Sequence, residues 1–136
     1  MAHVTCKATL IRCLDPRFVK TTEAWMEKEY GADTYESMSI AGPGKEIADE
    51  TNDGKCILNN IGKCIKLHKS PEVVIIFHNN CGNYGIENPE EEKEKQFSDA
   101  EKCKKRIRSM FPEIKVKNVW AEMNFETKQV NFSDIN

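Results

Sequence analysis

Two short segments, CLDPR and HNNCG, contain the residues of this chain that are best suited to chemistry. The first segment holds Cys13, Asp15 and Arg17, and the second holds His78 and Cys81. Two thiolates and one imidazole form a donor set that suits zinc, and a zinc ion with three protein ligands keeps a fourth position for water. Each segment is weak evidence alone, because buried thiols and a hydrogen-bonded core histidine are common. Together they predict a zinc site made by Cys13, His78 and Cys81, provided that the fold brings the segments together.

Asp15 and Arg17 follow Cys13 at every second position, so the three side chains can share one side of an extended segment. A carboxylate beside a guanidinium stays ionised and is held by paired hydrogen bonds. Asp15 could then serve as an activator that orients a water on the metal, or as an off-switch that swings onto the metal and closes the fourth position. The alternative without function is a loop salt bridge in which Pro16 sets the turn.

A zinc ion at this site would activate water. Zinc lowers the pKa of bound water from ~15.7 to about 7. Two thiolates place more negative charge on the metal than neutral ligands do, so we expect a somewhat smaller effect on the pKa of the water. The site is therefore expected to work best at slightly alkaline pH.

The elements that must position these residues alternate along the chain. Apolar periodicity and turn residues predict strands at 3–13, 34–41, 72–77, 114–123 and 129–133, and helices at 18–30, 55–68 and 89–110, with a further helical part before residues 52–54. This alternation predicts a three-layer α/β fold, with a mostly parallel four-stranded sheet, helices on both faces and an antiparallel C-terminal strand. If the first and third strands are neighbours, their carboxyl ends bring the two segments together.

Three glycines are candidates for binding a substrate or an anion. Gly42 and Gly44 flank Pro43 before a helical stretch, where a turn could cradle an anion such as bicarbonate, although a plain turn is the simpler interpretation. Gly82 follows the second cysteine of the proposed site and would let the backbone fold tightly behind the ligands.

The other cysteines suggest a second metal site only weakly. Cys64 and His68 lie four residues apart on one helix face and could chelate a metal, but packing of an amphipathic helix explains them better. Cys6 and Cys103 are expected to be core thiols.

Length and composition limit the classes of function. The 136 residues predict a single domain over residues 1–136. A net charge of −2 without a separate basic run argues against nucleic acid as a partner, and the longest apolar run, VVIIF, is too short to cross a membrane. The six cysteines come without an export signal, which favours reduced thiols and a cytoplasmic location.

The paired motifs C-x-D-x-R and H-x-x-C-G, in this order and each at the end of an expected strand, resemble those of the β-class carbonic anhydrases. The resemblance implies zinc on Cys13, His78 and Cys81, with Asp15 and Arg17 flanking the metal. It also implies a homodimer or a larger even homo-oligomer with sites near the subunit interface.

The function that this resemblance implies is zinc-dependent, reversible hydration of carbon dioxide to bicarbonate by a zinc-bound hydroxide. Two alternatives remain open from the sequence. The same site could hydrolyse carbonyl sulfide or carbon disulfide, since the shape of the access channel decides between these substrates. The chain could also be a catalytically silent zinc-binding domain in which Asp15 is locked on the metal.

Overall fold

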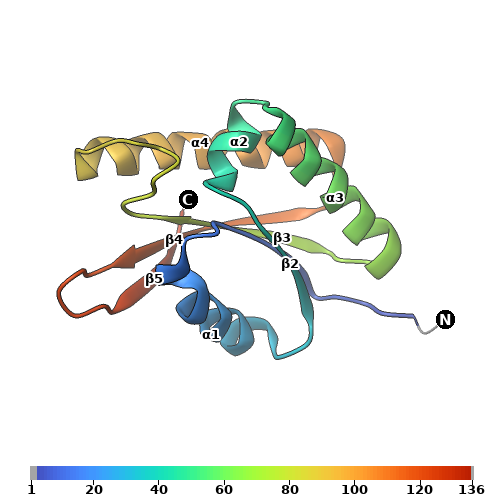
Figure 1. The fold of residues 1–136 in the computed structure, drawn as a ribbon. Coiled ribbons are helices and arrows are strands. Elements are labelled where there is room, and N and C mark those ends of the chain that lie inside the picture. Colours follow the sequence, from blue (N-terminus) through green and yellow to red (C-terminus); the bar gives the residue numbers. More distant parts are fainter. Residues whose placement is uncertain (1–2, 136) are drawn as a thin grey trace.

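A computed structural model describes residues 3–135 and shows an α/β fold with one five-stranded sheet (Figure 1). In chain order the elements are β1 (Ala8–Arg12), a 3-10 turn (Pro16–Phe18), α1 (Val19–Tyr30), β2 (Tyr35–Ser39), α2 (Pro43–Ala48), α3 (Asn52–His68), β3 (Glu72–His78), α4 (Pro89–Met110), β4 (Lys115–Met123) and β5 (Val130–Asp134). The strand order is β2-β1-β3-β4-β5, and only β5 pairs in the antiparallel direction. The predicted fold class is confirmed.

Helices cover both faces of the sheet, as Figure 1 shows, with α1 on one face and α2, α3 and α4 on the other. Alternate residues of β3 supply the two cores: Val74 and Ile76 pack in the cluster that contains Met26 of α1, whereas Ile75 and Phe77 pack in the cluster that contains Ile61 of α3. Burial on both faces explains why this central strand is continuously apolar. Among the described helices, none has the length and apolar character needed to cross a bilayer.

The neighbouring positions of β1 and β3 bring the two motif segments to one edge of the sheet. The strands pair in parallel, with Ile11 opposite Ile75, so the segments that follow them leave the sheet at the same, carboxyl end. CLDPR continues from β1, and HNNCG begins with the last residue of β3. The condition on which the predicted metal site depends is therefore met.

The break between the two central helices lies earlier than residues 52–54. The Thr51 hydroxyl caps α3 by accepting a hydrogen bond from the Gly54 backbone N–H at 3.1 Å, so residues 52–54 form the first turn of this helix. The expected turn at 42–44 is also partly helical, because Gly42 caps α2 with a left-handed backbone (φ 46°) and Pro43 opens the helix. Caps made by threonine and glycine account for both corrections.

Two glycines of α3 are expected to respond oppositely to alanine. A Cβ atom at Gly54 would overlap the backbone carbonyl of Glu46 in α2, whereas a Cβ atom at Gly62 would only touch the Phe111 ring at 3.4 Å. Gly54→Ala should therefore cost about 1–3 kcal/mol of unfolding free energy, as overpacking typically does. Gly62→Ala should be neutral or stabilise by up to about 1 kcal/mol, because alanine favours helix. Thermal unfolding followed by circular dichroism compares the two, and equal melting temperatures would contradict the close α2–α3 contact.

Candidate metal centre

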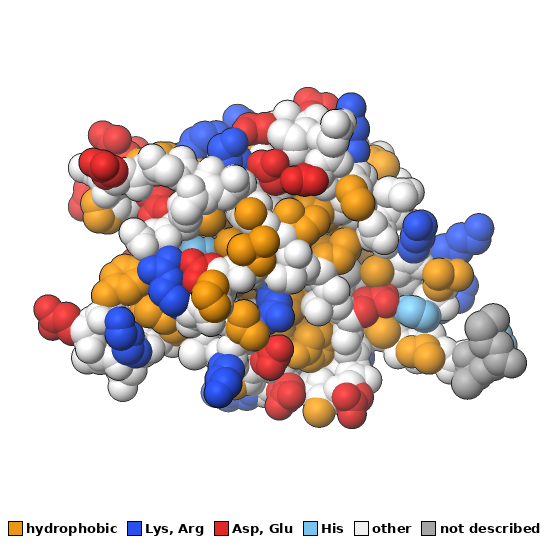
Figure 2. Space-filling model, in the orientation of Figure 1, with side chains coloured by type: hydrophobic (Ala, Val, Ile, Leu, Met, Phe, Trp, Pro, Cys, Tyr) orange, Lys and Arg blue, Asp and Glu red, His pale blue; other side chains and the backbone are white. Residues whose placement is uncertain are grey.

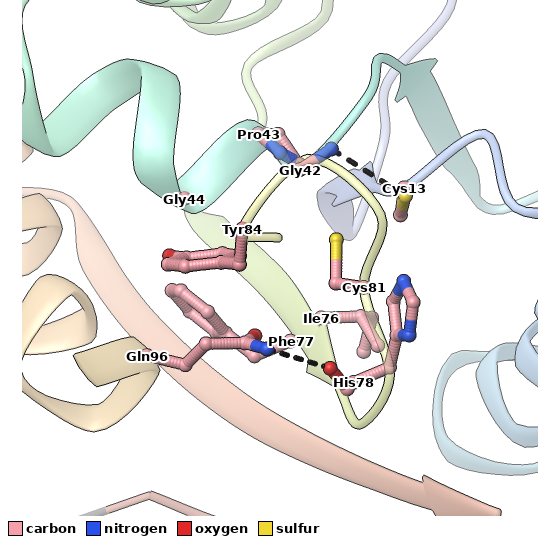
Figure 3. A pocket seen from close by; sticks show the side chains of 10 residues that line it. All are labelled: Cys13, Gly42, Pro43, Gly44, Ile76, Phe77, His78, Cys81, Tyr84 and Gln96. Carbon is pink, nitrogen blue, oxygen red and sulfur yellow. Dashed lines mark hydrogen bonds between the residues drawn. The ribbon is translucent and has the colours of Figure 1, made fainter. Parts of the chain in front are cut away.

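The side chains of Cys13, His78 and Cys81 meet at the edge where β1 and β3 end (Figure 3). One donor atom from each residue, two sulfurs and one ring nitrogen, lies within 4.8 Å of the others. All three residues are buried, and His78 is only 2% exposed. Cys13 comes from the loop after β1, and Cys81 comes from the loop after β3. Segments more than sixty residues apart in the sequence thus supply one compact donor set.

The His78 ring is prepared to bind a metal through one nitrogen. Its Nδ1 lies 2.8 Å from the backbone oxygen of Asn79, which can only accept, so Nδ1 carries the proton and Nε2 keeps a free lone pair. Nε2 is buried without a hydrogen-bond partner among the described residues. A buried acceptor without a partner is costly, and a metal ion beside the two sulfurs would satisfy it. These residues therefore fit zinc.

The surroundings of the two cysteines favour a thiolate at Cys13 over one at Cys81. A hydrogen bond from Cys81 lowers the pKa of Cys13, and the same contact together with burial raises the pKa of Cys81. The backbone N–H of Gly42 also points at Cys13 Sγ, at 3.4 Å, and supports a thiolate there. One thiolate is thus already stabilised, and a divalent cation in place of the Cys81 proton would stabilise the second.

Asp15 and Arg17 form an ion pair beside the donor set, with Arg17 Nη2 2.6 Å from Asp15 Oδ2 and Nε 3.0 Å from Oδ1. The hydrogen bonds from Arg17 hold the pKa of the Asp15 carboxyl below its usual range. Arg17 also donates to the side-chain and backbone oxygens of Asn80, each at 2.9 Å. The arginine therefore ties the CLDPR segment to the HNNCG segment, and Asp15 is engaged with it instead of joining the three donor atoms.

Two residues of α4 hold the HNNCG segment, and sequence reasoning missed both. The buried Glu92 carboxylate accepts hydrogen bonds from the backbone N–H groups of Asn80 (2.7 Å) and Cys81 (2.8 Å). The buried Gln96 amide donates to the His78 carbonyl at 2.7 Å. The run NPEEEKEK resembles a solvated helix start. The one signal in the sequence is that Glu92, within this run, lies four residues before Gln96 and therefore on the same helix face.

The asparagine after His78 joins the segment to the sheet. Asn79 donates through Nδ2 to the Met123 carbonyl at 3.0 Å and accepts at Oδ1 from the Met123 N–H at 2.9 Å. The Asn79 side chain thus pairs with the backbone at the end of β4, as the backbone of a neighbouring strand would.

The three candidate glycines occupy different surroundings. Gly42 lies against Asn83 and presents its N–H to Cys13, while a Cβ atom at Gly44 would overlap the Phe77 ring, so Gly44 lets α2 pack closely on β3. Gly82 has no heavy atom within 4 Å of a Cβ position, apart from its neighbours, and its φ is not left-handed. The backbone nevertheless turns tightly through Gly82, because the N–H groups of Tyr84 (3.1 Å) and Gly85 (3.3 Å) donate to the Cys81 carbonyl. The left-handed residue of the HNNCG segment is Asn80 (φ 56°).

A small cavity of about 10 Å³ lies beside the donor set (Figure 3). This volume is close to the minimum that one water molecule requires. Its lining comes from the loop after β1, the start of α2, the end of β3, the loop after β3, and α4: Cys13, Gly42, Pro43, Gly44, Ile76, Phe77, His78, Cys81, Tyr84 and Gln96. The Tyr84 hydroxyl donates to Asp99 Oδ2 at 2.9 Å and thus turns away from the sulfurs.

Glu92→Gln is expected to destabilise the protein by about 1–3 kcal/mol, the cost of leaving a buried donor without a partner. The new amide group would place an N–H donor against one of the two backbone N–H groups that the carboxylate now accepts from. Glu91→Gln is the matched control, because Glu91 precedes it in the same helix and is exposed. Urea unfolding of both variants measures the difference, and equal free energies of unfolding would contradict this role for Glu92.

Comparison with known proteins agrees with the geometry. The chain matches the sequence model of a family described as "Putative carbonic anhydrase" over residues 3–131. Two curated relatives, uncharacterized proteins of Rickettsia bellii and Rickettsia conorii, are each 28% identical over 116 residues. These alignments cover 79% of this chain, and 71% and 62% of the two relatives respectively.

Solved structures show the same fold. The β-carbonic anhydrase isoform I of Trichomonas vaginalis superposes with a TM-score of 0.64 at 14% identity, covering 97% of this chain and 84% of that chain. A structure from a study of two tetrameric β-carbonic anhydrases of Sordaria macrospora gives 0.61 at 13% identity, covering 95% and 81%. Because the family match spans residues 3–131 of the 136, the chain belongs to the family described as "Putative carbonic anhydrase".

Proposed function

We propose that this chain is a zinc enzyme that reversibly hydrates carbon dioxide to bicarbonate. The observation that carries the proposal is the buried His78 Nε2, which has no hydrogen-bond partner among the described residues and lies with Cys13 Sγ and Cys81 Sγ within 4.8 Å. Family membership and the β-carbonic anhydrase fold support the same reaction class. Cys13, His78 and Cys81 would hold the metal and leave its fourth position to water.

Zinc, when bound, supplies a water of lowered pKa as the nucleophile and polarises the reacting oxygen. Asp15 and Arg17 are the side chains that would orient this water. The Asp15 carboxylate, fixed by two Arg17 nitrogens, would accept a hydrogen bond from the attacking water and so direct a lone pair of the water toward the carbon of the substrate. Arg17 keeps this carboxylate ionised and holds it beside the HNNCG segment through Asn80. Phe18, with its ring centroid 4.2 Å from that of His78, shields the imidazole from bulk water.

The Asp15–Arg17 ion pair favours an enzyme over a silent zinc-binding domain. A domain with a locked metal would need the Asp15 carboxylate on the ion, whereas here both of its oxygens accept hydrogen bonds from Arg17. The cavity of about 10 Å³ is too small for carbon dioxide. The substrate would therefore approach from the outer side of the site, where the Arg17 side chain is 38% exposed.

The experiment that tests the proposal is a carbon dioxide hydration assay on protein with a measured zinc content. We expect hydration above the uncatalysed rate at alkaline pH, followed by stopped flow with a pH indicator. Carbonyl sulfide and carbon disulfide, assayed in parallel, are expected to be hydrolysed more slowly. A zinc-loaded sample that hydrates carbon dioxide only at the background rate would overturn the activity, and faster hydrolysis of a sulfur analogue would overturn the substrate.

We also propose that the chain forms a homodimer or a larger even homo-oligomer. Leu14 and Phe125 are large exposed apolar residues at the site, Leu14 beside Asp15 in the sequence and Phe125 with its ring centroid 5.4 Å from the Arg17 guanidinium. Figure 2 shows apolar side chains gathered across the middle of one face of the molecule. Exposed apolar surface of this kind marks protein interfaces, and the Sordaria macrospora structures are described as tetrameric. Light scattering coupled to size-exclusion chromatography measures the mass, and a monomer at micromolar concentration would contradict the proposal.

A further inference from the structure

A second group of metal-binding side chains lies at the opposite end of the parallel strands. Cys6 precedes β1, Glu36 is the second residue of β2, and His68 is the last residue of α3. One donor atom from each, a sulfur, a carboxylate oxygen and a ring nitrogen, lies within 4.8 Å of the others. All three residues are partly buried, so the donors are held by the fold and still accessible to an ion from solvent.

Hydrogen bonds already hold these three segments together. The Cys6 backbone N–H donates to the His68 carbonyl at 2.8 Å, which fixes the segment before β1 on the end of α3. His68 Nδ1 lies 2.6 Å from Glu36 Oε2, across a separation of 32 residues. An ion binding here would meet donors that need little rearrangement, and such preorganisation lowers the entropic cost of binding.

Glu36 supplies the negative charge of this group, and no lysine or arginine among the described residues forms an ion pair with it. Glu36 Oε1 is buried without a hydrogen-bond partner among the described residues, a cost that an ion would remove. The adjacent lysines are turned away, since Lys7 donates to the Tyr30 carbonyl and Lys69 to the Lys66 carbonyl. A second thiol, Cys64, lies beside the same carboxylate, and burial together with Glu36 raises its pKa to about 11.

We propose that Cys6, Glu36 and His68 bind a second zinc ion with a structural role. One thiolate and one carboxylate neutralise the double charge of the ion, and the mixed sulfur, nitrogen and oxygen donors match the ligands that zinc accepts. The site lies at the amino ends of the strands, away from the candidate metal centre at their carboxyl ends. Its effect is to fasten the segment before β1 to β2 and α3. The second site does not require the proposed carbon dioxide hydration.

Zinc stoichiometry tests the site directly. Three proteins are compared: wild type, the double variant Cys6→Ser/His68→Gln, and Cys56→Ser. Each is saturated with zinc and freed of unbound zinc by gel filtration, and its zinc and protein concentrations are then measured. The double variant should carry one equivalent of zinc less than wild type. Cys56→Ser removes an exposed thiol of α3, the helix that ends at His68, and should carry as much zinc as wild type. Glutamine at position 68 can still donate a hydrogen bond to Glu36, and circular dichroism verifies that the variants fold.

A second measurement separates this site from the candidate metal centre. In a Cys13→Ser/Cys81→Ser background, titration with Co²⁺ should still produce one equivalent of thiolate-to-metal absorption, and adding Cys6→Ser should remove it. Zinc should also raise the thermal unfolding midpoint of this background, but not after the further substitution. Equal zinc content in wild type and Cys6→Ser/His68→Gln, or a background variant without the absorption, would overturn the second site whatever the carbon dioxide assay shows.

Discussion

Cys81→Ser is expected to leave a folded protein that has lost both its zinc and its carbon dioxide hydration. Cys81 Sγ is one of three donor atoms in the candidate metal centre, and a serine hydroxyl is a much weaker zinc ligand than a thiolate. The loss of zinc affinity should exceed the ~10–100-fold effect that is typical of residues behind the ligands. Serine can still hydrogen-bond to Cys13 Sγ, so the loop should keep its conformation. Metal analysis after dialysis against a weak chelator measures the effect.

Cys103→Ser is the matched control for this experiment. Cys103 is also a buried thiol, and it donates to the Gly44 carbonyl at 3.1 Å, a bond that a serine hydroxyl can keep. Its variant should bind zinc and hydrate carbon dioxide as wild type does. A Cys81→Ser protein with full zinc content would show that the ion binds elsewhere, and the proposed centre would then be wrong.

Asp15→Asn is expected to separate zinc binding from activity. Asparagine keeps the shape of the side chain but removes the charge that Arg17 holds and the second acceptor oxygen. Zinc content should stay at the wild-type level, because Asp15 is outside the three-atom donor set. The hydration rate should fall by roughly 10–100-fold, which is the typical effect of substituting a residue that contacts a metal site without binding the ion.

Asp49→Asn is the control for a general effect of removing an ion pair. Asp49 pairs with Lys45 at 3.1 Å on the surface of α2, and its loss should leave the hydration rate unchanged. Arg17→Lys should lower the rate as well, because an ammonium cannot make the paired contacts to Asp15 and the two bonds to Asn80 together. A wild-type rate for Asp15→Asn would reduce the Asp15–Arg17 pair to a loop salt bridge.

Much of the fold could be predicted from local pattern. The continuous apolar run of β3 indicated a strand buried on both faces, and the alternation of strands and helices indicated a parallel sheet. The bounds of α4 agree with the expected 89–110, because Pro89 opens this helix and Pro112 follows it. The largest error is at the first strand, which was expected over residues 3–13 and spans only Ala8–Arg12. At α3, one capping hydrogen bond that the Thr51 hydroxyl accepts moved the beginning of the helix by three residues.

The types and spacing of Cys13, Asp15, Arg17, His78 and Cys81 were enough, from the sequence by itself, to indicate a zinc site and the class of chemistry. Only the tertiary structure revealed that Glu92 and Gln96 hold the HNNCG segment, and that His68 meets Cys6 and Glu36. The physical reason is that the ability of a side chain to bind a metal is a property of the residue type, and the sequence gives the residue type directly. Which residues meet across three separate segments depends on sheet order and helix packing, and the local periodicity of each segment leaves these undetermined.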